Sequence, residues 1–292
     1  MVSTLSIICM VITLLLSLIL PIGVFLWYGM RHDKSEIWLA GFLGACGFAI
    51  FQLGIRLPLL NKIAALPEFA GWVEEHYIIY CLLLAFTAGL FEVVGRYGVA
   101  KIVDKAKKHS KELTFETGFM AGIGHGGIEA AALVGLTYVN NLIYSAMVNM
   151  GLWESMMEEI QAAGDHSIYE VYASVPDLLI ETPWYLYLAS GYERILTMIA
   201  HIAMTLIVFY FVSRKKDVIG ILISLCFHTA IDFFVPLLNG FASEYLGNRI
   251  TQNTAYVLMY ILLTIIAVIA IVVIIKLKKS WKQADESAVC EG

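Results

Sequence analysis

The chain has 292 residues, of which 60% are hydrophobic and only 15% are charged, and its formal net charge is −5. Soluble domains contain about 45–50% apolar and about 25% charged residues, so the composition excludes a disordered chain and argues against an ordinary soluble α/β enzyme. The negative net charge argues against a nucleic-acid partner. We therefore expect a protein whose main partner is the lipid bilayer.

Seven apolar runs are long enough to cross a hydrocarbon core of about 30 Å as helices. In chain order they cover residues 3–28, 36–60, 72–97, 115–139, 192–212, 218–241 and 254–277. The first run has no basic leading segment and no clear small-residue cleavage site, so we interpret it as a retained span. The predicted fold is all-α: a single integral membrane domain over residues 1–292, with a core of four helices at about 72–241.

Most Lys and Arg residues gather in the connections on one side of this arrangement. They lie at positions 31–34, 101–111, 214–216 and 276–282, while the opposite connections hold Lys62, Arg194 and Arg249. The positive-inside rule then places the N-terminus outside and the C-terminus in the cytoplasm. An even number of spans would scatter these clusters, so the charge pattern favours seven. The expected location is a cell membrane, with the bacterial plasma membrane as the setting.

The segment 140–191 contains no Lys or Arg but several acidic residues and interleaved aromatic ones such as Trp153 and Trp184. This pattern predicts short amphipathic helices at the outer membrane interface. Two interpretations remain open. The segment is either a solvated connector anchored by aromatic side chains, or a lid over a site in the bundle.

Ionisable side chains occur inside four consecutive spans, where each costs on the order of 2.5–3.5 kcal/mol and marks a functional site by default. Their sequences, in chain order, are FEVVGRY with Glu92 and Arg96, GHGGIEA with His125 and Glu129, MIAHIAM with His201, and FHTAIDF with His228 and Asp232. Three of the four sets are i, i+4 pairs, which share one helix face. At about 1.5 Å of rise per residue, all lie roughly 13–22 Å from the cytoplasmic boundary. We expect them to meet at one level.

Each set also has a purely structural interpretation. Glu92 and Arg96 are compatible with a self-neutralising ion pair, His201 with a packing histidine, and the last pair with a helix–helix hydrogen bond. His125 is harder to explain in this way because Gly122, Gly124, Gly126 and Gly127 surround it. Glycines allow close helix approach, and they leave room for water or a substrate backbone.

Three chemistries use such a set of residues. Peptide hydrolysis needs a general base for water and donors for the oxyanion, which carboxylates and imidazoles supply. The same groups are ordinary zinc ligands. Chains of Asp, Glu and His also serve as proton relays in carriers.

At these motifs the sequence resembles the YhfC family of intramembrane proteases, relatives of the PrsW proteases and of the type II CAAX prenyl protease and bacteriocin-processing group. The resemblance covers about residues 42–234. It rests on an acidic–xxx–basic motif, a GxxHGGxE-like motif, a histidine and an HxxxD motif, one in each of four consecutive spans. It implies a glutamic-type intramembrane peptidase that acts on a peptide or membrane-protein substrate and needs no cofactor.

Carried over by motif, the resemblance implies that Glu92 activates water and that Arg96 holds its geometry. The CAAX group has two adjacent glutamates before xxxR, whereas this chain has Phe91 at the first of these positions. Either Glu92 takes the catalytic role or Glu129 on the next span supplies it, and we favour Glu92.

The remaining implied roles concern the histidines. His125 positions the water, His228 with Asp232 stabilises the oxyanion, and His201 completes the polar cavity. A metal-dependent variant of this site would bind zinc through His125, Glu129, His201 and His228. The alternatives from other classes are a proton-coupled carrier that uses the same residues and a non-catalytic scaffold or immunity-type protein. The oligomeric state and the substrate stay open.

Overall fold

The computed structural model describes residues 1–106, 113–164 and 166–290, with residues 284–290 described by their backbone only. Helices and no strands occur in these ranges, which confirms the all-α prediction. Lys107, Lys108 and Lys111 of the predicted basic run lie outside the described residues. In the described ranges, seven helical segments are long and apolar enough to cross a membrane: Thr4–His32, Ser35–Ala64, Tyr77–Ala106, Phe115–Asn149, Trp184–Ser213, Asp217–Phe241 and Gln252–Gln283.

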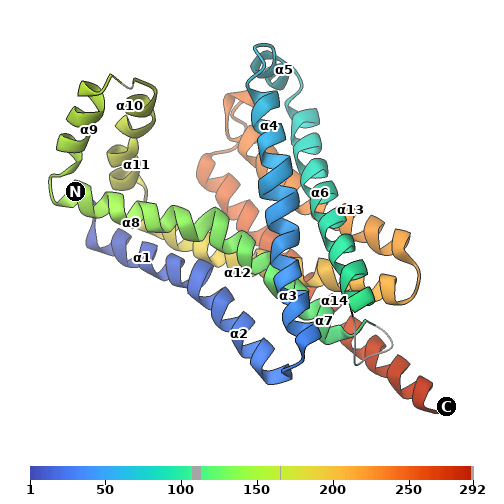
Figure 1. Ribbon diagram of the computed structural model, residues 1–292. Helices are drawn as coiled ribbons and strands as arrows, with labels where there is room; N and C mark the ends of the chain where they lie inside the picture. Colours follow the sequence, from blue (N-terminus) through green and yellow to red (C-terminus); the bar gives the residue numbers. More distant parts are fainter. Residues whose placement is uncertain (107–112, 165, 291–292) are drawn as a thin grey trace. The chain divides into compact units, whose positions relative to one another are not determined.

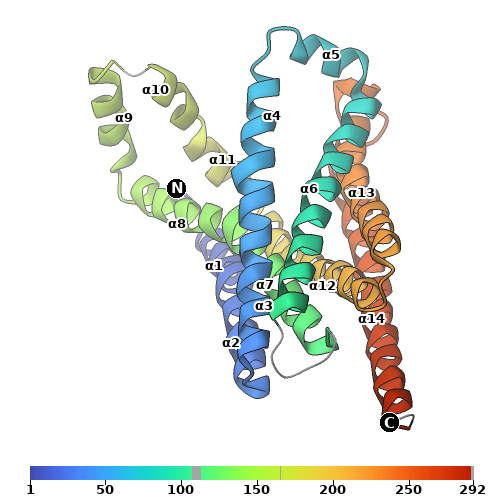
Figure 2. The same ribbon diagram turned by 45° about the vertical axis from the view of Figure 1, so that its right-hand side comes forward.

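These segments contain α-helices and, in three places, short π-helical stretches (Figures 1 and 2). In chain order the elements are α1 (Thr4–Leu14), η1 (Leu15–Ile19), α2 (Leu20–His32), α3 (Ser35–Phe48), η2 (Ala49–Arg56), α4 (Leu57–Ala64), α5 (Phe69–Glu75), α6 (Tyr77–Ala106), α7 (Phe115–Ala130), η3 (Ala131–Gly135), α8 (Leu136–Asn149), α9 (Trp153–Ala162), α10 (His166–Ala173), α11 (Val175–Glu181), α12 (Trp184–Ser213), α13 (Asp217–Phe241), η4 (Glu244–Leu246) and α14 (Gln252–Cys290).

The observed helices correct the predicted boundaries in three places. The third span begins at Tyr77, because Trp72 belongs to the separate helix α5, which ends at Glu75. The fourth span continues to Asn149. The fifth begins at Trp184, so Arg194 lies inside α12 rather than in a connection. The fourth and fifth helices are longer than predicted because helical hydrogen bonding continues beyond the apolar residues, and hydropathy detects only the apolar residues.

Contacts between residues divide the chain into two compact units, Met1–Ile22 with Ala130–Ile195 and Gly23–Glu129 with Leu196–Gly292. All seven predicted site residues belong to the second unit. In the first unit α1 packs against α8, and Thr13 donates a hydrogen bond to the Tyr187 carbonyl oxygen at 2.6 Å. The predicted short helices of the acidic segment are present as α9, α10 and α11. Their position at the membrane interface stays a prediction.

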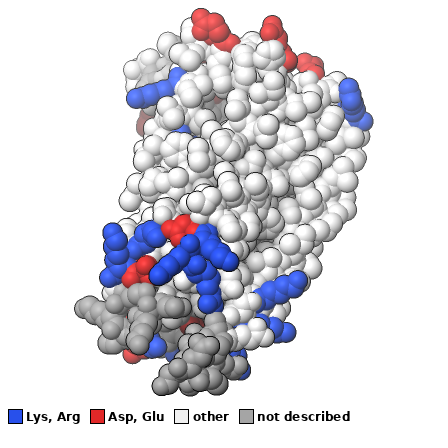
Figure 3. Space-filling view, turned by 90° about the vertical axis from the view of Figure 1, so that its right-hand side faces the viewer, with Lys and Arg blue, Asp and Glu red and all other residues white. Residues whose placement is uncertain are grey.

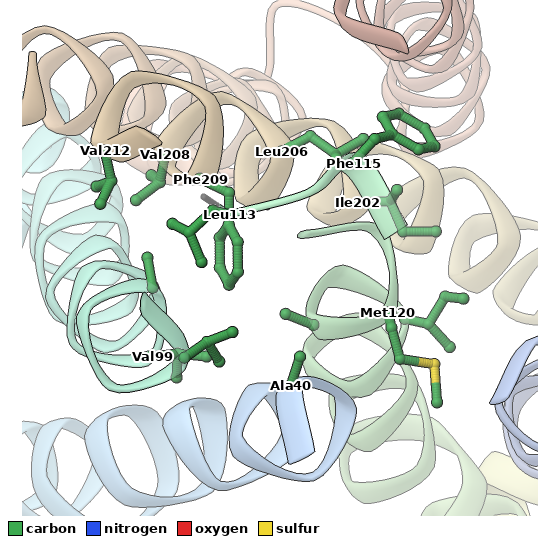
Figure 4. Close-up of a cluster of buried hydrophobic side chains, with 14 of the residues drawn as sticks. Ala40, Val99, Leu113, Phe115, Met120, Ile202, Leu206, Val208, Phe209 and Val212 are labelled. Carbon is green, nitrogen blue, oxygen red and sulfur yellow. The ribbon is translucent and has the colours of Figure 1, made fainter. Parts of the chain in front are cut away.

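In the second unit, α6 contacts α3 and η2 as well as α13, and α13 contacts α14 (Figure 2). Side chains from α12, α13 and α14 form one buried apolar cluster of this unit, and side chains mainly from α3, α6, α7 and α12 form another. Figure 4 shows part of this cluster, which includes Ala40, Val99, Met120, Leu206 and Phe209. The core holds the helices that carry the polar motifs in a fixed register.

The outer faces of the spans expose large apolar side chains, for example Leu83, Leu222 and Ile265, each about half accessible. On the face in Figure 3, charged side chains lie toward the two ends, mostly Lys and Arg at one end and both acidic and basic ones at the other, with a broad uncharged band between them. Soluble proteins rarely expose such large apolar areas, whereas lipid-facing helices require them. The chain is a multi-pass membrane protein.

Candidate active site

Four helices bring their ionisable side chains to one place inside the second unit. Helix α6 presents Glu92 and Arg96 on one face, and α7, α12 and α13 present the others. Six of the seven predicted residues are buried, with 1–8% of their surface exposed: Glu92, Arg96, His125, Glu129, His201 and His228. The structure therefore places the predicted residues together, while their catalytic roles stay predictions.

One oxygen of Glu92 lies at the centre of this cluster. Glu92 Oε2 lies 2.9 Å from Arg96 Nη2 and 2.9 Å from His125 Nε2. It lies 3.6 Å from His201 Nδ1 and 3.5 Å from His228 Nδ1. The other oxygen, Oε1, accepts no hydrogen bond from a described residue. The hydrogen bonds that the described residues make to this carboxylate thus all go to one oxygen.

Arg96 connects the helices through its guanidinium group. Besides Glu92, Nη2 lies 3.2 Å from His125 Nε2 and 2.6 Å from His201 Nδ1, and Nη1 lies 3.4 Å from His228 Nδ1. Glu92 and Arg96 therefore form the ion pair that the sequence analysis considered, but the pair also contacts three histidines. A guanidinium has only donors, so it orients every imidazole that accepts from it.

This orientation fixes tautomers. His201 and His228 each accept from Arg96 through Nδ1, so a neutral ring carries its proton on Nε2. His201 Nε2 lies 2.7 Å from Glu129 Oε2, and His228 Nε2 lies 3.1 Å from Asp232 Oδ2. His228 is thus hydrogen-bonded to both Arg96 and Asp232, whereas His201 is hydrogen-bonded to Arg96 and makes a short contact with Glu129 that lacks hydrogen-bond geometry.

Asp232 differs from the other members of the set. Its side chain is 39% exposed, against 3% for the side chain of His228, which it contacts. It lies one turn further along α13 and touches only the edge of the cluster. Asp232 therefore orients His228 rather than facing Glu92 directly.

The glycines around His125 bring helices together. A Cβ on Gly124 would collide with the Gly41 carbonyl oxygen of α3, and one on Gly122 would lie 2.7 Å from Ile202 Cα of α12. A Cβ on Gly126 would lie 3.2 Å from His201 Cβ. The prediction of close helix approach is confirmed. The predicted open space at these three positions is wrong, because neighbouring helices fill it.

The donor set suits a metal ion. Glu92, His125, Glu129 and His201 each offer one ligand atom, and these atoms lie within 4.8 Å of one another. Imidazole nitrogen and carboxylate oxygen are the donors zinc prefers, at about 2.0–2.2 Å. The set differs from the predicted one because Glu92 takes the place of His228. Arg96 Nη2 contacts Glu92 and both histidines of the set, so a bound cation would compete with this guanidinium.

Sequence reasoning missed two buried polar residues in the π-helical part of the second span. Arg56 and Gln52 are 5% and 8% exposed and lie on η2, which packs against α6. The available signal was the arginine in FQLGIRLP, an ionisable residue within an apolar run.

The buried pair of Glu92 and Arg96 allows a stability prediction. Arg96→Gln removes the guanidinium but leaves a buried carboxylate, so we expect the protein to lose about 3–5 kcal/mol of stability. Thermal unfolding in detergent measures the change. Lys101→Gln is the matched control because Lys101 and Asp217 form a half-exposed pair, which contributes at most about 1 kcal/mol. The double variant Glu92→Gln with Arg96→Gln should be more stable than Arg96→Gln alone, and a less stable double variant would contradict the interpretation.

The fold and the site together define a class: a multi-pass helical membrane protein with an enclosed cluster of carboxylates, imidazoles and one guanidinium. The chain belongs to the YhfC intramembrane metalloprotease family, whose sequence model matches residues 16–261. It is similar to the uncharacterized membrane protein YhfC of Bacillus subtilis strain 168, with 26% identity over 237 residues, 81% of this chain and 85% of that protein. No solved structure matches the chain.

Proposed function

We propose that the protein is an intramembrane endopeptidase that hydrolyses a peptide bond of a membrane-associated or transmembrane substrate. Membership of the YhfC family supports this proposal. The observation that carries it is the arrangement around Glu92, whose Oε2 is surrounded by four side-chain nitrogens while no described residue donates a hydrogen bond to Oε1. Hydrolysis needs this combination of a positioned base and nearby donors.

Glu92 acts as the general base. Its Oε1 accepts a proton from a water molecule, the water oxygen attacks the substrate carbonyl carbon, and the proton passes to the nitrogen of the leaving amine. Arg96 and His125 hold Oε2 and so determine the direction in which Oε1 points. Glu129 plays a different part, because it lies against His201 Nε2 and orients that ring.

The oxyanion that forms on the carbonyl oxygen needs donors already in place. We assign this role to His228, which would turn its Nε2–H from Asp232 Oδ2, 3.1 Å away, to the oxyanion, because its Nδ1 accepts from Arg96. His201 lies next to it, with ring centroids 5.5 Å apart. Two imidazoles from different helices thus approach the same oxygen of Glu92, Oε2, at 3.6 and 3.5 Å.

A metal ion fits the same donors. Glu92, His125, Glu129 and His201 would hold it, and zinc supplies a Lewis acid that activates water near neutral pH and polarises a carbonyl group. In that case Glu92 would be a ligand, Arg96 would move away from the donor atoms, and Glu129 would be a second ligating carboxylate. The glutamic-type and metal-dependent mechanisms differ in a measurable way.

The metal content of the purified protein distinguishes the two mechanisms. If the metal-dependent variant is correct, purified protein retains about one equivalent of zinc, as expected for a single site. His125→Gln should lose it because an imidazole ligand is removed. His76→Gln is the matched control, since His76 is exposed in the turn between α5 and α6. Elemental analysis that finds no metal in the wild type, together with intact cleavage, would leave the glutamic-type mechanism.

The contacts also favour a second candidate, a proton-coupled carrier. Carboxylates and imidazoles alternate across four helices, with successive polar atoms 2.7–3.6 Å apart, in the order Asp232, His228, Glu92, His201 and Glu129. Such a series of Asp, Glu and His is the arrangement of a proton relay. A carrier would show ligand-dependent proton flux in proteoliposomes that is lost in His201→Ala. Cleavage without flux would discard it.

A further inference from the structure

Arg56 is a buried cation outside the catalytic cluster. It lies at the end of η2, inside the second span, and only 5% of its surface is exposed. Burying a charge within a membrane span is expensive, and such residues are retained when they pair with another charge or serve a pathway or substrate. A π-helical stretch within a longer helix is itself frequent at functional sites.

The guanidinium of Arg56 has neutral partners only. Nε donates to Thr87 Oγ1 at 3.2 Å, and Nη2 donates to the Leu84 carbonyl oxygen at 2.7 Å. Among the described residues, no carboxylate lies within ion-pair distance of Arg56, and Nη1 makes no hydrogen bond. The positive charge is therefore held in place by α6 but is not neutralised there.

The neighbouring Gln52 is also incompletely bonded. It lies one turn before Arg56 and is 8% exposed, and its Oε1 has no hydrogen-bond partner in the described part of the chain. Phe48 lies one turn earlier again, and its ring packs edge-on against the His125 ring at 5.3 Å. Phe48, Gln52 and Arg56 thus form one buried face that leads away from the catalytic cluster.

Helix α6 also connects Arg56 to the catalytic cluster. Thr87, which bonds to Arg56, precedes Glu92 by five residues, or about 7 Å along the helix axis. Arg56 is therefore connected to the site in two ways, through Thr87 on the helix that carries Glu92 and through its own helix, on which Phe48 contacts His125. We expect it to be within reach of a chain a few residues long that extends from the scissile bond.

We propose that Arg56 and Gln52 form a subsite that binds a carboxylate of the peptide substrate, either an acidic side chain or a chain terminus near the cleaved bond. This inference rests on the proposed peptidase function. The guanidinium fork matches a carboxylate geometrically, and a carboxylate supplies the counter-charge that Arg56 lacks in the protein. A neutral substrate would leave Arg56 without this partner and would bind more weakly.

The test uses the full chain in lipid nanodiscs and fluorescent synthetic single-span peptides. One series carries Asp or Asn at successive positions, and a second carries a C-terminal acid or amide within the apolar segment. Anisotropy measures binding, and mass spectrometry measures cleavage separately. We expect at least about tenfold tighter binding of the acidic member at one position, as for a hydrogen-bonded charge pair. The series that shows the preference identifies the source of the carboxylate.

The variants then assign the preference to Arg56. Arg56→Gln should abolish it, Arg56→Lys should retain part of it, and Gln52→Leu should reduce it. Lys62→Gln is the matched control, because Lys62 is an exposed cation on the adjoining α4. An unchanged preference in Arg56→Gln would overturn the subsite. If Arg56→Gln fails to fold, wild-type protein without a carboxylate preference at any position overturns it instead.

The outcomes separate the two proposals. Cleavage without carboxylate preference would overturn the subsite and leave the peptidase function standing. Carboxylate-selective binding that depends on Arg56, with no cleavage of any peptide, would support the subsite and count against the peptidase function.

Discussion

Replacing Glu92 by Gln lowers the rate of substrate cleavage by about 10²–10⁴-fold, the usual contribution of a general base. The substitution preserves the shape of the side chain but removes the ability to accept a proton from water. Cleavage of a co-expressed single-span substrate, and of the same substrate in proteoliposomes, measures the effect. Glu129→Gln should lower the rate less, because Glu129 acts through His201 rather than on the water.

The control for Glu92→Gln is Glu116→Gln. Glu116 lies in the first turn of α7, outside the cluster, and is only partly buried. This variant should cleave like the wild type. Wild-type cleavage by both Glu92→Gln and Glu129→Gln would show that neither carboxylate is the base, and the glutamate mechanism would then be abandoned.

Gly124→Ala should destabilise the second unit and abolish cleavage. Its new methyl group would meet the Gly41 carbonyl oxygen of α3, and backbone cannot move aside as a flexible side chain does. Overpacking of this kind costs about 1–3 kcal/mol or more. Because His125 is the next residue and packs against Phe48 of α3, separation of α3 from α7 would also move a residue of the site.

Thermal unfolding in detergent and cleavage are the two measurements for Gly124→Ala. Gly98→Ala is the matched control, since nothing lies within 4 Å of a Cβ built at Gly98 on α6. We expect the control to unfold and cleave like the wild type. If Gly124→Ala behaves like Gly98→Ala, the close approach of α3 and α7 is not a requirement of the fold.

The seven spans and the composition of the site were predictable from local information. A helix in a bilayer satisfies its backbone hydrogen bonds within itself, so apolar length alone predicts each span. Ionisable residues are costly there, which singled out Glu92, His125 and the other motif residues without any knowledge of packing. Arg56 was equally costly, but it lay outside the four motif-bearing spans and was overlooked.

The tertiary structure decided which atoms meet. The rotation and crossing of helices, which no local pattern encodes, place Arg96 between Glu92 and three histidines. They also place Asp232 at the edge of the cluster and fill the space beside Gly124 with α3. In the group of residues that could hold a metal ion, Glu92 stands where His228 was predicted. The sequence by itself determined which side chains must be kept away from lipid, because that cost belongs to each residue alone. Only the packed helices determined their partners, because a contact depends on two surfaces at once.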